Sequence, residues 1–184
     1  MKRQNTSWPV ALCGVTAALS TALMLLGAIL PIAMFIAPAV GGIFIGVVAV
    51  ECGRRWAWTA YAAASVLGLL FVPDKETALF FVLLLGYYPL VKPRLDRLRP
   101  AALRVGAKLL LCNGAAAVLY AGMLLFFPGG EAAGELRAAA FILGAATLLM
   151  GNVAFLLFDR ALANLLRVYR LLWQPRLHKM LGRR

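Results

Sequence analysis

Histidine is almost absent from this sequence, and the single one, His178, lies near the carboxyl end. A metal centre or a histidine-based catalytic dyad is therefore not expected. The three cysteines, Cys13, Cys52 and Cys112, match no metal-binding spacing, and we predict that they are small packing residues. The long apolar runs also lack the paired carboxylates or histidines that chemistry on a lipid would need. We predict no enzymatic activity, no catalytic residue, no metal and no cofactor.

Charge is also scarce. Only 14% of the 184 residues are charged, 63% are hydrophobic, and the mean hydropathy is +0.86. A soluble domain of this length would need more charge to cover its surface. The charge that is present is mostly of one sign, with a net charge of +12. Nucleic acid is not the expected partner, because no recognition motif with interleaved aromatic residues accompanies the basic residues. Anionic lipid headgroups are the simpler partner.

Long apolar runs predict that the chain spans a membrane. A helix needs about 20 apolar residues to cross the hydrocarbon core, and these runs are too uniformly apolar for the strands of a barrel. Backbone polar groups in lipid must be satisfied internally, which favours helices. We therefore predict an all-α, polytopic membrane protein, with a six-helix domain at 1–158 and a basic tail at 159–184. The predicted spans are 8–30, 32–50, 56–72, 77–91, 105–127 and 138–158.

Basic residues fall in alternate gaps between these runs. Seventeen of the 19 lie before the first run, after the second, from the end of the fourth into the fifth, or after the sixth. The other gaps hold only Lys75 and Arg137, together with four of the seven acidic residues. Short loops rich in Lys and Arg stay in the cytoplasm. The pattern therefore predicts that both termini are cytoplasmic.

The tail after Phe158 carries apolar residues at helical spacing, with arginines mostly between them. This pattern predicts an amphipathic helix, which either lies on the inner membrane surface or extends the sixth span. It could anchor the chain to headgroups or dock on a partner protein. The apolar positions are Leu162, Leu165, Leu166, Tyr169, Leu172 and Trp173.

Polar residues near the inner ends of the spans form a predicted inner cluster. We expect Glu51 to pair with Lys92, Lys108 or Arg54, because a carboxylate at that depth is costly unless it is paired; the alternative is that these charges reach out to the interface. The asparagines would clamp neighbouring helices or contact a ligand. Pro89 would kink the fourth span and make a hinge. The cluster comprises Glu51, Tyr87, Tyr88, Lys92, Lys108, Asn113 and Asn152.

Two further patterns suggest contact surfaces. Gly14, Ala18 and Ala22 recur every four residues in the first span and form a face that permits close helix approach, either within the protein or with a partner. The outer halves of the spans are apolar and aromatic. A pocket that opens outward there would favour an apolar or flat ring ligand, unless these side chains only face lipid or fill the core. The candidate ligand-binding residues are Phe35, Phe80, Tyr120 and Phe141.

Together these features resemble the substrate-binding S component of an energy-coupling-factor transporter, a type of ABC importer. The stretch Gly86–Lys92, and Lys108, Leu109 and Asn113, also resemble segments of small bacterial membrane proteins. The resemblance implies a protein of the bacterial cell membrane that captures a small apolar or vitamin-like molecule from outside and topples to release it inside. It also implies that the face of Gly14, Ala18 and Ala22 contacts a coupling protein, whose ATPases supply the energy.

An alternative comes from another class of protein. The rod-shape-determining scaffold of bacterial wall synthesis has the same kind of six-helix fold and carries no substrate. The chain would then be an interaction subunit, and the segment 92–104 and the basic tail would be its docking surfaces. A ligand that co-purifies with the protein would favour the transporter component over the scaffold.

Overall fold

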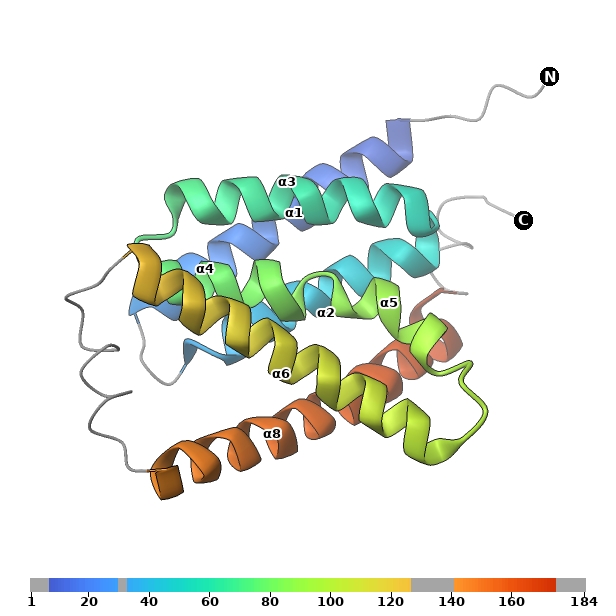
Figure 1. The fold of residues 1–184 in the computed structure, drawn as a ribbon. Helices are drawn as coiled ribbons and strands as arrows, with labels where there is room; N and C mark the ends of the chain where they lie inside the picture. The colour runs from blue at the N-terminus through green and yellow to red at the C-terminus, as the bar shows by residue number, and fades with distance from the viewer. Residues whose placement is uncertain (1–6, 30–32, 127–140, 175–184) are drawn as a thin grey trace. The chain divides into compact units, whose positions relative to one another are not determined.

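The computed structural model describes residues 7–29, 33–126 and 141–174, and this part of the chain consists of helices joined by short turns (Figure 1). Two short segments, η2 and η3, are π-helical. The elements are α1 (Ser7–Ile29), α2 (Ile36–Glu51), α3 (Arg54–Phe71), α4 (Lys75–Phe80), η2 (Phe81–Leu85), α5 (Tyr88–Leu95), α6 (Ala101–Phe126), α8 (Phe141–Val168) and η3 (Tyr169–Trp173).

Among the described residues, four helical segments are long and apolar enough to cross a membrane. Helix α2 is apolar but has 16 residues, and so falls just short of the roughly 17 that the shortest spans need. Helix α3 begins with Arg54 and Arg55, which lower its mean hydropathy. The four segments are Ser7–Ile29, Lys75–Leu95, Ala101–Leu119 and Leu148–Trp173.

The chain divides into two compact units. Unit 1 comprises Met1–Pro93 and Ala161–Arg184, and unit 2 comprises Arg94–Arg160. In unit 1, α1 packs against α2 and α3, and α2 also packs against η2. The core includes fully buried side chains from α1, α2, α3, α4 and η2, among them Met24, Ile45, Val48, Ala57, Ala60, Ala64, Ala78 and Phe81.

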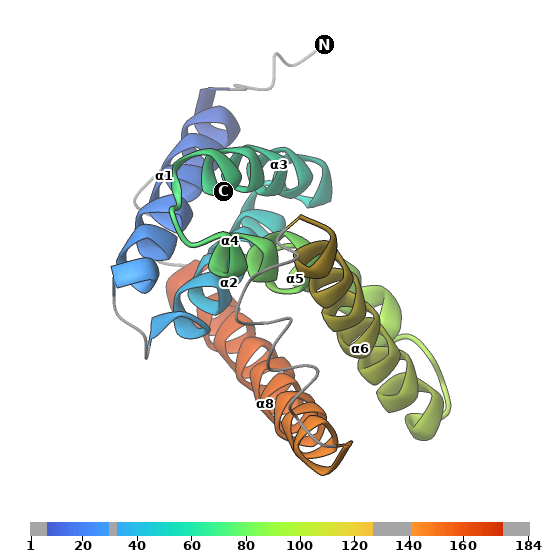
Figure 2. The same ribbon diagram turned by 60° about the vertical axis from the view of Figure 1, so that its left-hand side comes forward.

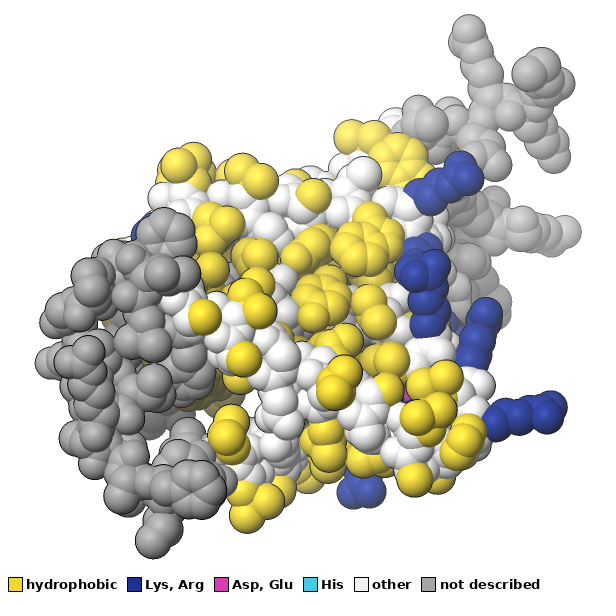
Figure 3. Space-filling view, viewed as in Figure 1, with side chains coloured by type: hydrophobic (Ala, Val, Ile, Leu, Met, Phe, Trp, Pro, Cys, Tyr) yellow, Lys and Arg dark blue, Asp and Glu magenta, His cyan; other side chains and the backbone are white. Residues whose placement is uncertain are grey.

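The surface of α1 is the reverse of what a soluble helix presents. Thr16 and Ser20 are buried, whereas Val15 is 64% and Leu26 is 56% exposed. The Ser20 hydroxyl donates a hydrogen bond to the Gly41 carbonyl oxygen at 3.3 Å. Figure 3 shows hydrophobic side chains spread over the visible face of the molecule. Small or polar residues at helix contacts with large apolar residues outside suit a lipid environment, and the protein is therefore of the membrane-embedded class.

The helix ends of unit 1 alternate. The beginning of α1, the end of α2, the beginning of α3 and the end of α5 lie at one end of the unit (Figures 1 and 2). At the other end, the Asp74 carboxylate caps α4 by accepting hydrogen bonds from the backbone N–H groups of Glu76 and Thr77. The Lys75 ammonium donates to the carbonyl oxygens of Leu69 and Val72 at 3.0 and 2.9 Å.

Several predicted boundaries differ from the observed ones, and the helix of the fifth predicted span, for example, begins at Ala101 rather than at 105. Helix α2 begins at Ile36 rather than at 32, because residues 33–35 form a turn. The fourth segment begins at Lys75 because Asp74 supplies its cap. The helix of the sixth predicted span continues past 158 to Val168, followed by η3, which agrees with the alternative that the tail extends this span. Asp159 does not end it, because this carboxylate is paired inside unit 2. The predicted loop 128–137 and His178 lie outside the described residues.

Candidate functional site

The fourth segment contains a break in its helical hydrogen bonding. The Gly86 N–H donates to the Phe81 carbonyl oxygen at 2.7 Å, a bond one residue longer than that of an α-helix. Pro89, which follows, has no N–H with which to bond the Leu85 carbonyl. The Tyr61 hydroxyl of α3 donates to the Val82 carbonyl oxygen at 2.7 Å and satisfies one of the displaced acceptors. Such π-helical turns are frequent at functional sites.

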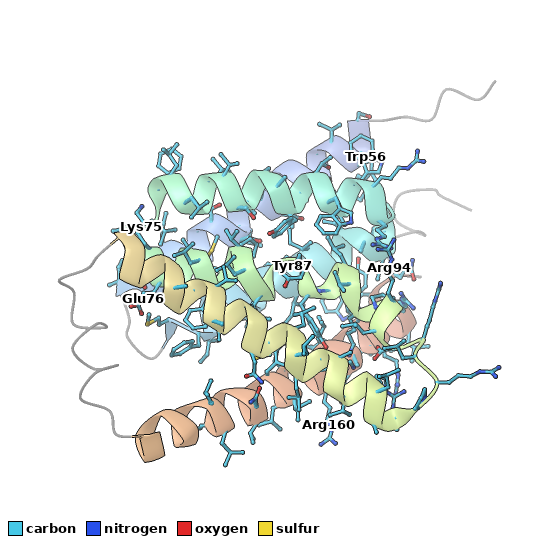
Figure 4. The ribbon with its side chains drawn as sticks, in the orientation of Figure 1. Trp56, Lys75, Glu76, Tyr87, Arg94 and Arg160 are labelled. Atoms are coloured by element: carbon cyan, nitrogen blue, oxygen red, sulfur yellow. The ribbon has the colours of Figure 1, made fainter. Side chains whose placement is uncertain are left out.

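Aromatic rings surround Tyr61 beside this break. Trp58 and Tyr87 meet the Tyr61 ring edge-on, with ring centroids 5.6 and 6.2 Å away, and the Phe81 ring lies at 6.1 Å. In Figure 4, Tyr87 lies between Trp56 at one end of unit 1 and Lys75 and Glu76 at the other. Three aromatic residues, one each from α3, η2 and the turn before α5, therefore gather around one side chain.

Tyr88 is packed inside unit 1. Its side chain is fully buried, with the Lys92 ammonium 5.9 Å from the ring centroid. Lys92 itself is only 8% exposed. Tyr88 is therefore a packing residue of unit 1 that lies directly after the irregular turn at Gly86.

Glu51 accepts a hydrogen bond from Tyr169, which was not among its predicted partners. The Tyr169 hydroxyl in η3 donates a hydrogen bond to Glu51 Oε1 at 3.0 Å. Nearby in the same unit, a methyl group on Gly46 would lie 3.3 Å from Leu166 and Pro89, so the tail, α2 and α5 are in close contact. The tail as far as Gln174 is therefore a continuation of the helix that packs on α2. The proposed pairs of Glu51 with Lys92 and Arg54 remain predictions.

Unit 2 contains the clearest charged cluster among the described residues. The Lys108 ammonium lies 2.6 Å from Asp96 Oδ1 and 2.8 Å from Asp159 Oδ2. Lys108 is 5% exposed and Asp159 9%, whereas the side chain of Asp96 is 40% exposed. Burying an ammonium is costly, and two carboxylates compensate that cost. We call these three residues the ion triad.

The predicted inner cluster therefore divides between the two units. Glu51, Tyr87, Tyr88 and Lys92 belong to unit 1, and Lys108, Asn113 and Asn152 belong to unit 2. The partners of Lys108 are Asp96 and Asp159, neither of which was predicted. Asp159 was interpreted as a span end, and Asp96 is hidden within a basic stretch. The sequence did offer one signal for these partners. Both aspartates lie near the ends of long apolar runs, where a carboxylate needs a partner such as Lys108.

The asparagines of unit 2 behave differently from each other. Asn113 is exposed, and its predicted role as a clamp stays a prediction. Asn152 is half-buried, and its Oδ1 atom is buried without a hydrogen-bond partner among the described residues. A buried orphan acceptor is costly and is therefore rare. Of the two, Asn152 fits a polar contact better.

The remaining predicted site residues are only partly described. Gly14, Ala18 and Ala22 are all exposed on α1, and no atom lies within 4 Å of the position of a Gly14 Cβ. Phe35 and Phe80 come together edge-to-face, with ring centroids 5.1 Å apart. Tyr120 and Phe141 belong to α6 and α8, but their side chains lie outside the described part of the structure.

Metal-ligating groups are dispersed in the part of the chain that the structure describes, where no three His, Cys, Asp or Glu residues gather around a common point. The three cysteines are free thiols: Cys112 is buried, and Cys13 donates to the Trp56 carbonyl oxygen at 3.3 Å. Comparison with known proteins adds no relative: no family model, no curated protein and no solved structure matches this chain.

Proposed function

We propose that the chain crosses a bacterial cell membrane six times, with both termini in the cytoplasm. The six crossings are α1, α2, α3, the segment from α4 to α5, α6 and α8. The side-by-side packing of α1 with α2 and α3 supports crossings by α2 and α3, which are too short or too basic to be assigned by hydropathy alone. Arg54 and Arg55 then lie on the cytoplasmic side and Asp74–Glu76 outside, in accord with the distribution of basic residues.

We propose that this membrane protein is the substrate-capturing component of an energy-coupling-factor type importer. The observation that carries the proposal is the exposed face of Gly14, Ala18 and Ala22 on α1. The opposite face of α1 packs within unit 1 through Ala17 and Met24, which are 3% and 0% exposed. Internal packing therefore leaves the small-residue face available for close approach by another helix.

The proposed ligand is a small apolar or vitamin-like molecule. The contact of Phe35 with Phe80 supports an apolar lining at the outer end of unit 1, because it joins the turn before α2 to the end of α4. Tyr120 and Phe141 belong to unit 2 and remain candidate ligand-binding residues from the sequence. Apolar pockets with few polar groups select shape and hydrophobic area rather than charge.

The test is the effect of Ala18→Leu on a complex with the coupling protein and its ATPases. A larger side chain on a face used for close approach should prevent helix contact, so the complex should not co-purify. Ala62→Leu is the matched control, because Ala62 is also exposed, lies on α3, and is outside the proposed face. Retention of the complex by Ala18→Leu, or its equal loss with Ala62→Leu, would contradict the proposed docking face.

A non-transporting scaffold subunit is the second candidate. The observation in its favour is that Phe35 and Phe80 pack directly on each other, which fills space that a ligand would need. Native mass spectrometry of the purified protein separates the two candidates. A bound small molecule that is lost in Phe80→Ala supports capture, whereas an empty protein under several growth conditions supports the scaffold.

A further inference from the structure

The turn between α5 and α6 has a concentration of exposed arginines. Arg94, Arg97 and Arg99 are all exposed in unit 2. The Arg97 N–H donates to the Arg94 carbonyl oxygen at 3.2 Å, and the Leu98 N–H donates to the Leu95 carbonyl oxygen at 3.2 Å. These bonds make the segment a compact turn. We call residues 94–100 the arginine turn.

The position of the arginine turn in the sequence fixes its depth. It connects the candidate membrane segments Lys75–Leu95 and Ala101–Leu119, so only residues 96–100 lie between two crossings. A connection this short cannot carry its side chains far into water. The three guanidinium groups therefore stay at the level of the lipid headgroups, where phosphate is the nearest abundant anion.

The ion triad contains the carboxylates that could otherwise neutralise these arginines. Asp96 and Asp159 are the two carboxylates that the structure describes in unit 2, and both contact the Lys108 ammonium. Asp96 belongs to the arginine turn, so its 2.6 Å contact also fastens the turn to α6. Lys108 thus draws carboxylate charge inward, while the arginines stay exposed. Figure 4 shows Arg94 extending outward at the end of its segment.

We propose that the arginine turn is a binding surface for the phosphate groups of anionic phospholipids. Guanidinium groups bind phosphate oxygens through two parallel hydrogen bonds, which a lysine cannot reproduce. The three exposed arginines match more than one phosphate group, and the lipid source is immediately beside the turn. This inference rests on the membrane-embedded fold and is independent of whether the protein transports a substrate.

Native mass spectrometry of the full chain in detergent tests the proposal. The protein is titrated with phosphatidylglycerol or phosphatidylcholine, and bound lipids are counted. Wild-type protein should prefer phosphatidylglycerol, and the triple variant Arg94→Gln, Arg97→Gln, Arg99→Gln should lose affinity by roughly fivefold for each arginine removed. The matched control is Arg54→Gln with Arg55→Gln, which removes exposed arginines from unit 1 and should keep most of the preference.

Three other outcomes of this titration would contradict the proposed lipid-binding surface. Equal loss in the control variant would mean general electrostatic attraction rather than a site. Equal binding of the two lipids by wild type would leave an acidic protein segment as the partner of the turn. Displacement of phosphatidylglycerol by inorganic phosphate at the same concentration would assign the surface to the free anion.

A second variant tests the role of the ion triad. Lys108→Met removes the ammonium that both carboxylates contact beside the arginine turn, and should weaken phosphatidylglycerol binding although every arginine remains. Adding Asp96→Asn and Asp159→Asn removes those carboxylates and should restore binding. Unchanged lipid binding in a folded Lys108→Met protein would overturn the idea that the triad keeps the arginines available.

Discussion

Single glycines decide how closely the helices of unit 1 approach. A methyl group on Gly42 would collide with the Leu85 carbonyl oxygen, and one on Gly41 would lie 3.2 Å from the Phe81 ring. Helix α2 can therefore lie against η2 only because these positions lack a side chain. The sequence emphasised the small residues of α1, but the closest backbone approach uses a glycine of α2. Nothing in the α2 pattern distinguishes Gly42 from its neighbours without the packed partner.

We expect Gly42→Ala to destabilise the protein by roughly 1–3 kcal/mol, because the atom it meets belongs to the backbone and cannot rotate away. The measurement is the free energy of unfolding in detergent with increasing denaturant. Gly114→Ala is the control, because no atom lies within 4 Å of that position and the change should be nearly neutral. Equal stability of the two variants would show that α2 and η2 separate easily.

At the scale of elements, the fourth segment is helical without being regular. Helix α4, segment η2 and helix α5 follow one another from Lys75 to Leu95, and the change of hydrogen bonding falls before Pro89. The proline predicted an irregularity near this position. It did not predict that Tyr61, on another helix, would bond a freed carbonyl group and hold the break in place. The partner was hidden because it lies 21 residues earlier in the sequence.

Removing that hydroxyl should weaken the element contact between α3 and η2. Tyr61→Phe keeps the ring contacts with Trp58 and Phe81 but leaves the Val82 carbonyl oxygen without this donor. We expect a loss of about 1 kcal/mol in unfolding free energy. Thr59→Val is the comparison, since the Thr59 hydroxyl is exposed, donates to the Trp56 carbonyl oxygen one turn back, and should matter less. A Tyr61→Phe protein as stable as the parent would indicate that the break needs no support from α3.

At the scale of the whole molecule, the orientation in the membrane is the property with the widest consequences. The proposed topology places the arginine turn in the cytoplasm and Asp74–Glu76 outside. Both the proposed ligand capture and the proposed lipid surface depend on separate sides of the bilayer. Direct chemical labelling can establish those sides without any knowledge of the ligand.

In a variant without the native cysteines, Glu76→Cys should react with a membrane-impermeant maleimide added to intact cells. Arg97→Cys should react only after the membrane is permeabilised, because its turn is cytoplasmic in the proposed topology. Labelling of both positions from outside, or the reverse pattern, would exclude the arrangement with both termini inside. A position within α3, such as Ala64→Cys, is buried and should remain unlabelled in both conditions.

The sequence by itself determined the class of this protein and much of its helical outline. Long apolar runs leave backbone polar groups with no alternative to helices, so α1, α3 and α6 begin and end near the predicted residues. The exposed position of Gly14, Ala18 and Ala22 also agrees with a face available to a partner, although a partner contact remains a prediction. These features depend on local composition and spacing, which a sequence contains in full.

Tertiary structure alone decided the partners of the polar residues. Lys108 pairs with Asp159, 51 positions away, and Tyr169 bonds Glu51, 118 positions away. Within lipid, a charge or hydroxyl group is stable where another polar group faces it, and that depends on how the helices are arranged in space. The same arrangement lets α8 continue past Asp159, because the Lys108 ammonium compensates the charge of this carboxylate within the helix.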